Sequence, residues 1–154
     1  MTPFLPPSVP FAINLWVAAR LLPFVIKNRP LDEILARATP DAGAHGYDEL
    51  SAPRIVEEVK RVVAQPMRMR GRRCLREGLL AFHYLSLAGH RPILHFGLLP
   101  QTIMTAHPRA HCWITIDGAI MLNPPEVPMI DLFAYDGSSA VAANDARLAQ
   151  ASYG

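Results

Sequence analysis

The sequence predicts an α+β fold in which a buried helix that begins at a cysteine packs on a small antiparallel sheet. Three observations lead to this prediction. Apolar residues recur at helical spacing in the first part of the chain, and the segment from Cys74 to Ala88 is apolar almost all the way round. The residues that follow alternate as short strands, two of them joined by Asp117 and Gly118. A helix that is apolar on all sides is buried, so we expect this one at the centre of the fold.

The composition indicates one globular domain. A chain of 154 residues is long enough for one hydrophobic core but too short for two of ordinary size, and 51% apolar residues favour burial. The net charge of +2 by itself argues neither for nor against a nucleic-acid partner, and we expect none. The 15 prolines lie mostly outside the centre, which divides the chain into an N-terminal helical region (1–66), a core (67–125) and a partly disordered tail (126–154).

The two cysteines and the apolar N-terminal run indicate the cellular compartment in which the protein is expected. Cys74 and Cys112 could form at most one disulfide, and no secretory signal precedes them, so a reduced, cytoplasmic protein is expected. The run from Phe11 to Ile26 is interrupted by an amide, a charge and a proline, and it falls short of the roughly 20 apolar residues of a membrane span. We therefore expect a buried or partner-docking helix rather than a membrane anchor.

Three helices are predicted before the central one. They cover residues 11–22, ended or kinked by Pro23, residues 30–38, and residues 51–65, with Ser51 as N-cap. Residues 39–50, which contain a proline and two glycines, are predicted to form a loop.

Four arginines precede Cys74 within the seven residues 67–73. Such a run is usually a solvated loop, and it lacks the aromatic residues of a nucleic-acid platform. Positive charge near a thiol also favours the thiolate, and a contact with an acidic peptide is a further alternative. Cys74 falls in the first turn of the central helix, where unpaired N–H groups stabilise negative charge. Gly89 is expected to cap the other end.

Three strands are predicted next, at Ile93–Leu98, His111–Ile116 and Ala119–Asn123. A two-residue Asp-Gly turn would pair Cys112 with Asn123, whereas a three-residue loop would pair His111 with Asn123. The second register is preferred because it gathers one wholly apolar face. That face would consist of Cys112, Ile114, Ile120 and Leu122.

The preferred register places four residues on the opposite face, His111, Trp113, Met121 and Asn123. There the amide could hold the imidazole in one tautomer. A cysteine that opens a helix, followed by a histidine and an amide on later strands, is typical of thiol-nucleophile enzymes. In the tail, Ile130, Leu132 and Phe133 are expected to pack back onto the core, and residues 137–154 to be frayed or weakly helical.

The other histidines and the second cysteine have plainer interpretations. Cys112 is expected in the core, and His83, His90 and His95 as hydrogen-bonded or surface residues. His107 and His111 have a spacing that suits a metal only on a helix, and a proline lies between them. Neither a metal nor a cofactor is expected.

The order of these motifs resembles the transglutaminase-like B proteins of lasso-peptide biosynthesis, which cut the leader from a precursor peptide. The resemblance covers residues 67–125. It consists of Cys-Leu at the head of an apolar helix, a glycine 15 positions on, a strand, Ala-His-x-Trp-x-x-x-Asp-Gly, and Leu-Asn. It implies a transglutaminase or papain-like core.

The resemblance implies Cys74 as nucleophile, His111 as general base and Asn123 as third member of the triad. The family usually has aspartate at the third position, so Asp117 is the alternative, and Trp113 is expected to wall the site. A second departure is Glu77-Gly78, where the family often has Arg-Ser.

The implied partners are a precursor peptide, which binds through its leader, a separate leader-recognition protein, and the lasso cyclase. The implied activity is that of a cysteine peptidase that acts through a thioester acyl-enzyme. Two alternatives stay open: another thiol acyltransferase on the same core, and a non-catalytic member that binds peptide or partner enzymes.

Overall fold

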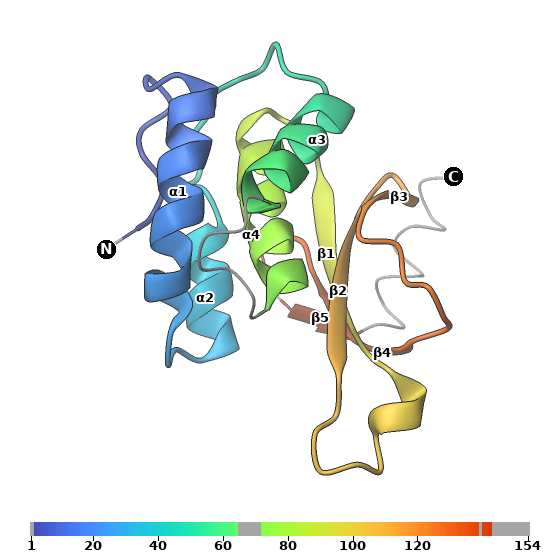
Figure 1. Ribbon diagram of the computed structural model, residues 1–154. Helices are drawn as coiled ribbons and strands as arrows, with labels where there is room; N and C mark the ends of the chain where they lie inside the picture. The colour runs from blue at the N-terminus through green and yellow to red at the C-terminus, as the bar shows by residue number, and fades with distance from the viewer. Residues whose placement is uncertain (1, 65–71, 139, 143–154) are drawn as a thin grey trace. The chain divides into compact units, whose positions relative to one another are not determined.

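The computed structural model describes residues 2–64, 72–138 and 140–142, with side chains up to 138. The chain forms two compact units, residues 1–90 and 91–154. The first holds helices and the second holds strands, which confirms the α+β class (Figure 1). The domain boundaries at 66 and 125 stay an interpretation of the sequence. The helices are α1 (Phe11–Ile26), α2 (Leu31–Ala38), α3 (Ala52–Val63) and α4 (Arg73–Leu87).

Helix α1 continues past Pro23 to Ile26, so the predicted end at that residue is wrong. A proline inside a helix costs about 3 kcal/mol, because it removes a hydrogen bond and crowds the preceding turn. Val25 and Ile26 are buried in the additional turn, and burying such side chains stabilises by about 1.5–3 kcal/mol each. Their burial offsets the cost of Pro23. None of the helices that the structure describes is long and apolar enough to cross a membrane.

Helices α2 and α3 confirm their predictions at nearly the expected bounds. Ser51 is the N-cap of α3, although its side chain makes no capping hydrogen bond there. The predicted stop at Pro66 and the arginines at 68 and 70 lie outside the described residues.

A buried polar network fixes the helical unit. The side chain of Asn14 on α1 exchanges two hydrogen bonds with the main chain of Leu5, of 3.0 and 2.9 Å. Its amide nitrogen donates to the hydroxyl of Tyr47, and its oxygen accepts from the hydroxyl of Tyr84 on α4, both at 2.8 Å. Burial raises the pKa of the Tyr84 phenol, which therefore stays a donor. The network ties the N-terminal segment, α1, the loop at Tyr47 and α4 together.

Helix α4 is the buried centre of this unit and contacts α1, α2 and α3. It begins at Arg73, after Arg72 in a left-handed conformation with φ of 56°. It ends at Leu87 with Ala88 as C-cap, and the predicted cap Gly89 follows as the next residue, with φ of 82°. The N–H of Gly89 donates to Ser86 O at 3.1 Å and that of His90 to Leu85 O at 3.0 Å, which is the Schellman arrangement.

The second unit is an antiparallel sheet with the strand order β3-β2-β1-β4-β5. Its strands are β1 (Pro92–Leu98), β2 (Ala110–Ile116), β3 (Ala119–Leu122), β4 (Ile130–Tyr135) and β5 (Ala140–Ala142). A 3-10 turn, η1 (Pro100–Thr102), lies in the loop between β1 and β2.

Two of these strands lie in the predicted tail. Strand β4 pairs with the central strand β1, and β5 pairs with β4, so the expectation of frayed or helical structure is wrong for Ala140–Ala142. Residues 143–154 lie outside the described residues. Leu132 is the extra residue of a bulge in β4, which breaks the alternation by which a strand is recognised from sequence.

The preferred register of the β2–β3 hairpin is also wrong. Ile116 pairs with Ala119 across a two-residue turn, and Asp117 and Gly118 both have positive φ, of 49° and 81°, as a type I′ turn requires. The register then shifts at a bulge between Ile114 and Thr115.

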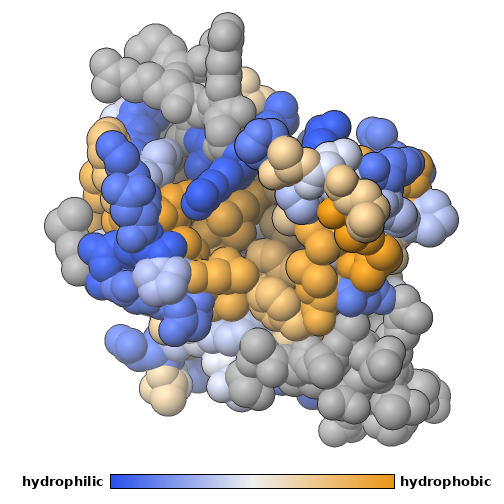
Figure 2. Space-filling model, turned by 90° about the horizontal axis from the view of Figure 1, so that it is seen from below, coloured by the Kyte–Doolittle hydropathy of each residue, from blue (hydrophilic) through white to orange (hydrophobic). Residues whose placement is uncertain are grey.

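The predicted apolar face of the hairpin is therefore correct only in part. Ile114 pairs with Leu122, and both are fully buried, as is Cys112. Ile120 pairs instead with Thr115 and is 50% exposed. Other large apolar side chains also reach the surface, in the second unit and on α1, and orange patches are visible among hydrophilic residues in Figure 2.

Candidate active site

Cys74 is the second residue of α4 and is half-buried. The first hydrogen bond of the helix runs from the N–H of Arg76 to Arg72 O at 3.1 Å, and the N–H groups of the turn before it point along the helix start. Arg72, as N-cap, has no side-chain acceptor to offer them. Donors of this kind stabilise a negative charge on a thiolate or an oxyanion.

Charged side chains surround the first turn of α4. Arg73 Nε donates to Glu77 Oε1 at 2.9 Å, and the carboxylate is almost fully buried. Arg76 is buried as well, and burial lowers its pKa, while the adjacent Glu77 opposes that change. Glu77, where the family often has arginine, thus supplies a negative charge that balances the arginines beside Cys74.

His111 lies on β2, and its Nε2 atom is 2.9 Å from the main-chain oxygen of Asn123. A carbonyl oxygen can only accept, so Nε2 carries the proton in this contact. In the neutral ring, Nδ1 is then the acceptor, and Nδ1 is the atom that could take a proton from a thiol.

The side chain of Asn123 does not make the expected contact with the imidazole. Its Nδ2 atom is buried and has no hydrogen-bond partner among the described residues. Its backbone is left-handed, with φ of 53°. The sequence thus predicted two groups that the structure brings together, His111 and Asn123, but through the carbonyl rather than the amide.

Trp113 is buried and forms one side of the region around His111. Its ring stacks on that of His111, with centroids 6.2 Å apart, and on that of His95, at 5.3 Å. His95 Nε2 lies 2.8 Å from the hydroxyl of Thr115. Because His95 pairs directly with Trp113 across β1 and β2, the stack joins two adjacent strands.

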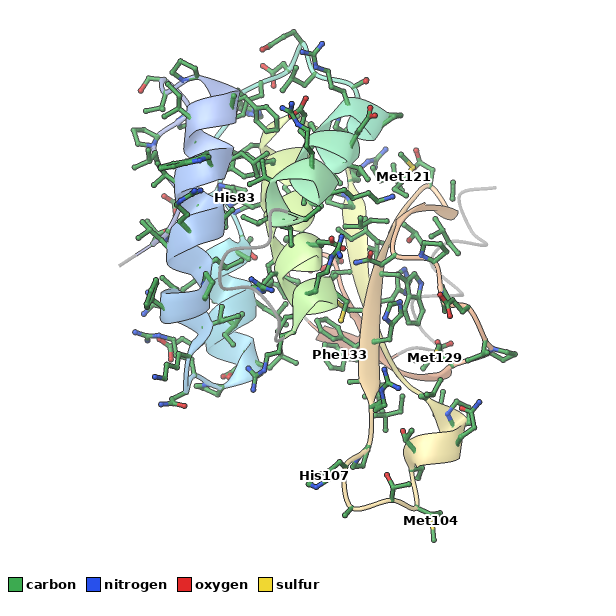
Figure 3. All side chains as sticks on the ribbon, in the orientation of Figure 1. His83, Met104, His107, Met121, Met129 and Phe133 are labelled. Carbon is green, nitrogen blue, oxygen red and sulfur yellow. The ribbon has the colours of Figure 1, made fainter. Side chains whose placement is uncertain are left out.

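Gly97 provides the space for the Trp113 ring. A Cβ atom at Gly97 would lie 3.1 Å from Trp113 Cζ3, 3.0 Å from Met129 Cβ and 3.2 Å from Ile130 O. Figure 3 labels Met129, on the connection between β3 and β4. The alternation of β1 puts His95 and Gly97 on one face, which is a signal that the sequence analysis did not use.

Asp117, the alternative third member, is exposed in the turn of the hairpin. It is separated from His111 by six positions along β2, which is about 20 Å of extended strand. The structure does not bring it to the imidazole.

His83 and His90 are hydrogen-bonded, as the sequence predicted. His83 Nδ1 lies 3.0 Å from Ala38 O, and His90 Nε2 lies 3.1 Å from Leu50 O. Burial lowers the pKa of His83 to about 4, and its ring stacks on Phe4. His107 is exposed in the loop before β2, at the position labelled in Figure 3. Within the described residues, His, Cys, Asp and Glu form no group of three that could hold a metal.

A comparison with protein families decides the wider relationship. The family model described as the transglutaminase-like superfamily matches residues 12–129, which is most of the chain. The protein belongs to the transglutaminase-like superfamily. Members of this superfamily are mostly cysteine peptidases or acyltransferases. The match begins inside α1 and ends just before β4, so it includes the N-terminal helices as well as the region of Cys74 and His111. Searches of curated proteins and of solved structures found no match.

Proposed function

We propose that this transglutaminase-like protein is a cysteine peptidase that removes the leader from a lasso-type precursor peptide. The superfamily supports thiol acyl chemistry, and the resemblance over residues 67–125 supports the finer assignment. The observation that carries the chemistry is the position of Cys74 in the first turn of a buried helix, where the helix dipole favours negative charge.

In the first step, Nδ1 of His111 takes the proton of the Cys74 thiol, and the thiolate attacks the carbonyl carbon at the end of the leader. The N–H groups at the start of α4 bind the oxyanion that forms, and one such donor is worth about 3 kcal/mol. His111 then gives its proton to the leaving amine as the C–N bond breaks, which releases the remaining peptide and leaves the leader as a thioester.

In the second step, His111 accepts a proton from water while the oxygen attacks the thioester carbonyl. The C–S bond breaks, the thiol regains a proton, and the leader leaves with a carboxylate terminus. Trp113 shields one side of His111 through its ring contact. A separate leader-recognition protein presents the peptide, and the cyclase of the pathway takes the released product.

The test is mass spectrometry of a lasso-type precursor incubated with the protein and a leader-recognition partner. We expect two products from the wild-type protein and none from Cys74→Ala. Cys112→Ala is the matched control, because Cys112 is buried in the sheet and has no place in the mechanism. Loss of cleavage in both variants would point to a folding defect.

The two rival functions give different results in the same assay. An acyltransferase would form an amide when a small amine is added, in preference to hydrolysis. A non-catalytic member would leave the precursor intact, and Cys74→Ala would then behave like the wild-type protein.

A further inference from the structure

We propose that residue 123 positions His111 through its main-chain carbonyl, and that asparagine is needed there for its left-handed backbone rather than for its amide. This inference rests on the proposed function, in which His111 is the general base. It differs from the role in which a side chain at this position orients the imidazole.

The contact itself is the first argument. His111 Nε2 lies 2.9 Å from Asn123 O, a normal hydrogen-bond distance, while the amide nitrogen of the same residue is buried without a partner among the described residues. A buried donor with no acceptor destabilises a fold, so the amide gains nothing from its present position. The group that holds the ring belongs to the main chain.

The path of the chain is the second argument. The bulge adds one residue to β3, so Leu122 pairs with Ile114. Asn123 is the first residue after the strand. At Asn123 the chain enters a left-handed conformation, with φ of 53°. The proline at position 124 disfavours a right-handed helical backbone in the residue before it.

Residue preference is the third argument. Glycine adopts a left-handed backbone freely, asparagine and aspartate do so more readily than other residues, and alanine does so at a cost. A position that needs φ above zero therefore accepts glycine, which has no side chain at all. A position that needs an amide or a carboxylate does not.

Three variants separate the two roles. Asn123→Ala removes the amide and disfavours the left-handed backbone, and we expect kcat/KM for leader cleavage to fall about tenfold. Asn123→Gly removes the amide but keeps the backbone, and it is expected to recover most of that loss. Asn123→Asp tests the carboxylate that the family usually has. The pH profile of kcat/KM should keep its wild-type shape in Asn123→Gly, because the carbonyl still holds the imidazole.

A second measurement does not depend on cleavage. Nitrogen-15 NMR of the His111 ring, recorded in the inactive Cys74→Ala background, reports which ring nitrogen carries the proton. We expect the Nε2–H tautomer with Asn123 and with Asn123→Gly, and a mixture of tautomers with Asn123→Ala.

The inference is overturned if Asn123→Gly loses as much activity as Asn123→Ala, or if its His111 shifts to the Nδ1–H tautomer. If the wild-type protein cleaves no precursor, the proposed function fails, and the NMR result still decides how His111 is held.

Discussion

The indole of Trp113 lies parallel to the imidazole of His95, with an interplanar angle of 6° and ring centroids 5.3 Å apart. The indole also stacks on the imidazole of His111, with centroids 6.2 Å apart. The rings are in register because His95 pairs with Trp113, and His111 with Gly97, across β1 and β2. The position of His111 therefore depends on the packing of Trp113 as well as on its own hydrogen bond.

Gly97→Ala should disturb this stack. The added methyl group would meet Trp113, Met129 and the main chain at 3.0–3.2 Å, closer than ordinary contact, and overpacking of this kind costs about 1–3 kcal/mol. We expect a lower free energy of unfolding and a changed fluorescence spectrum, since Trp113 must move. Ala119→Val is the control, because that strand residue is exposed. Unchanged stability and fluorescence in Gly97→Ala would contradict the packing described here.

Asn14→Ala should destabilise the helical unit strongly. It removes the partners of the Tyr84 hydroxyl and of the Leu5 main chain in a fully buried position, and stranded polar groups cost about 1–3 kcal/mol each. Chemical denaturation should show a loss of about 3 kcal/mol or more. Ile13→Ala, on the exposed side of the same helix, should change stability by less than about 0.5 kcal/mol. Equal effects of the two substitutions would argue against the network.

Stability should decrease with acid because of His83. Burial lowers its pKa in the folded protein to about 4, from an ordinary value of 6.5, so between these values the unfolded chain binds a proton that the folded protein does not. As far as His83 is concerned, the free energy of unfolding has its highest value above pH 6.5. It falls by about 1.4 kcal/mol per pH unit towards pH 4, so the total decrease is about 3 kcal/mol.

Denaturation at several pH values measures this dependence. His83→Gln should remove most of the slope, because glutamine does not titrate. His107→Gln should retain it, because His107 is exposed. A slope that persists in His83→Gln would assign the acid sensitivity to another group.

Asp117→Asn should leave leader cleavage unchanged. Asparagine also suits the first position of a type I′ turn, and the turn is the role that the structure shows for Asp117. If Asp117 were the acidic member of a triad, the same substitution would lower kcat by about 10⁴-fold. Precursor cleavage rates for the two proteins distinguish these cases.

Local signals predicted most of the helical unit. The apolar spacing located α1 to α4, and Gly89 marked the end of α4 because only a residue that accepts positive φ fits there. Pro23 misled the prediction because the compensation comes from the burial of Val25 and Ile26, which a local rule does not include.

The sheet was predicted less well, for a related reason. A bulge adds one residue to a strand and reverses the alternation beyond it, so neither the β2–β3 register nor β4 follows from a period of two. The candidate site has the same limit. A sequence shows which side chains are available, whereas the group that contacts His111 is a carbonyl whose direction depends on the bulge and on φ at Asn123.

The bonds between Asn14 and Leu5 also determine how the chain can be joined to other proteins. Both main-chain polar groups of Leu5 are held by one buried side chain, so the peptide is fixed from this residue onwards. Phe4 is buried as well and stacks on His83, so a tag or recognition domain placed ahead of it would be tethered only by the residues before Phe4. The length of a flexible linker, and with it the effective concentration of a tethered peptide, should therefore be counted from that point.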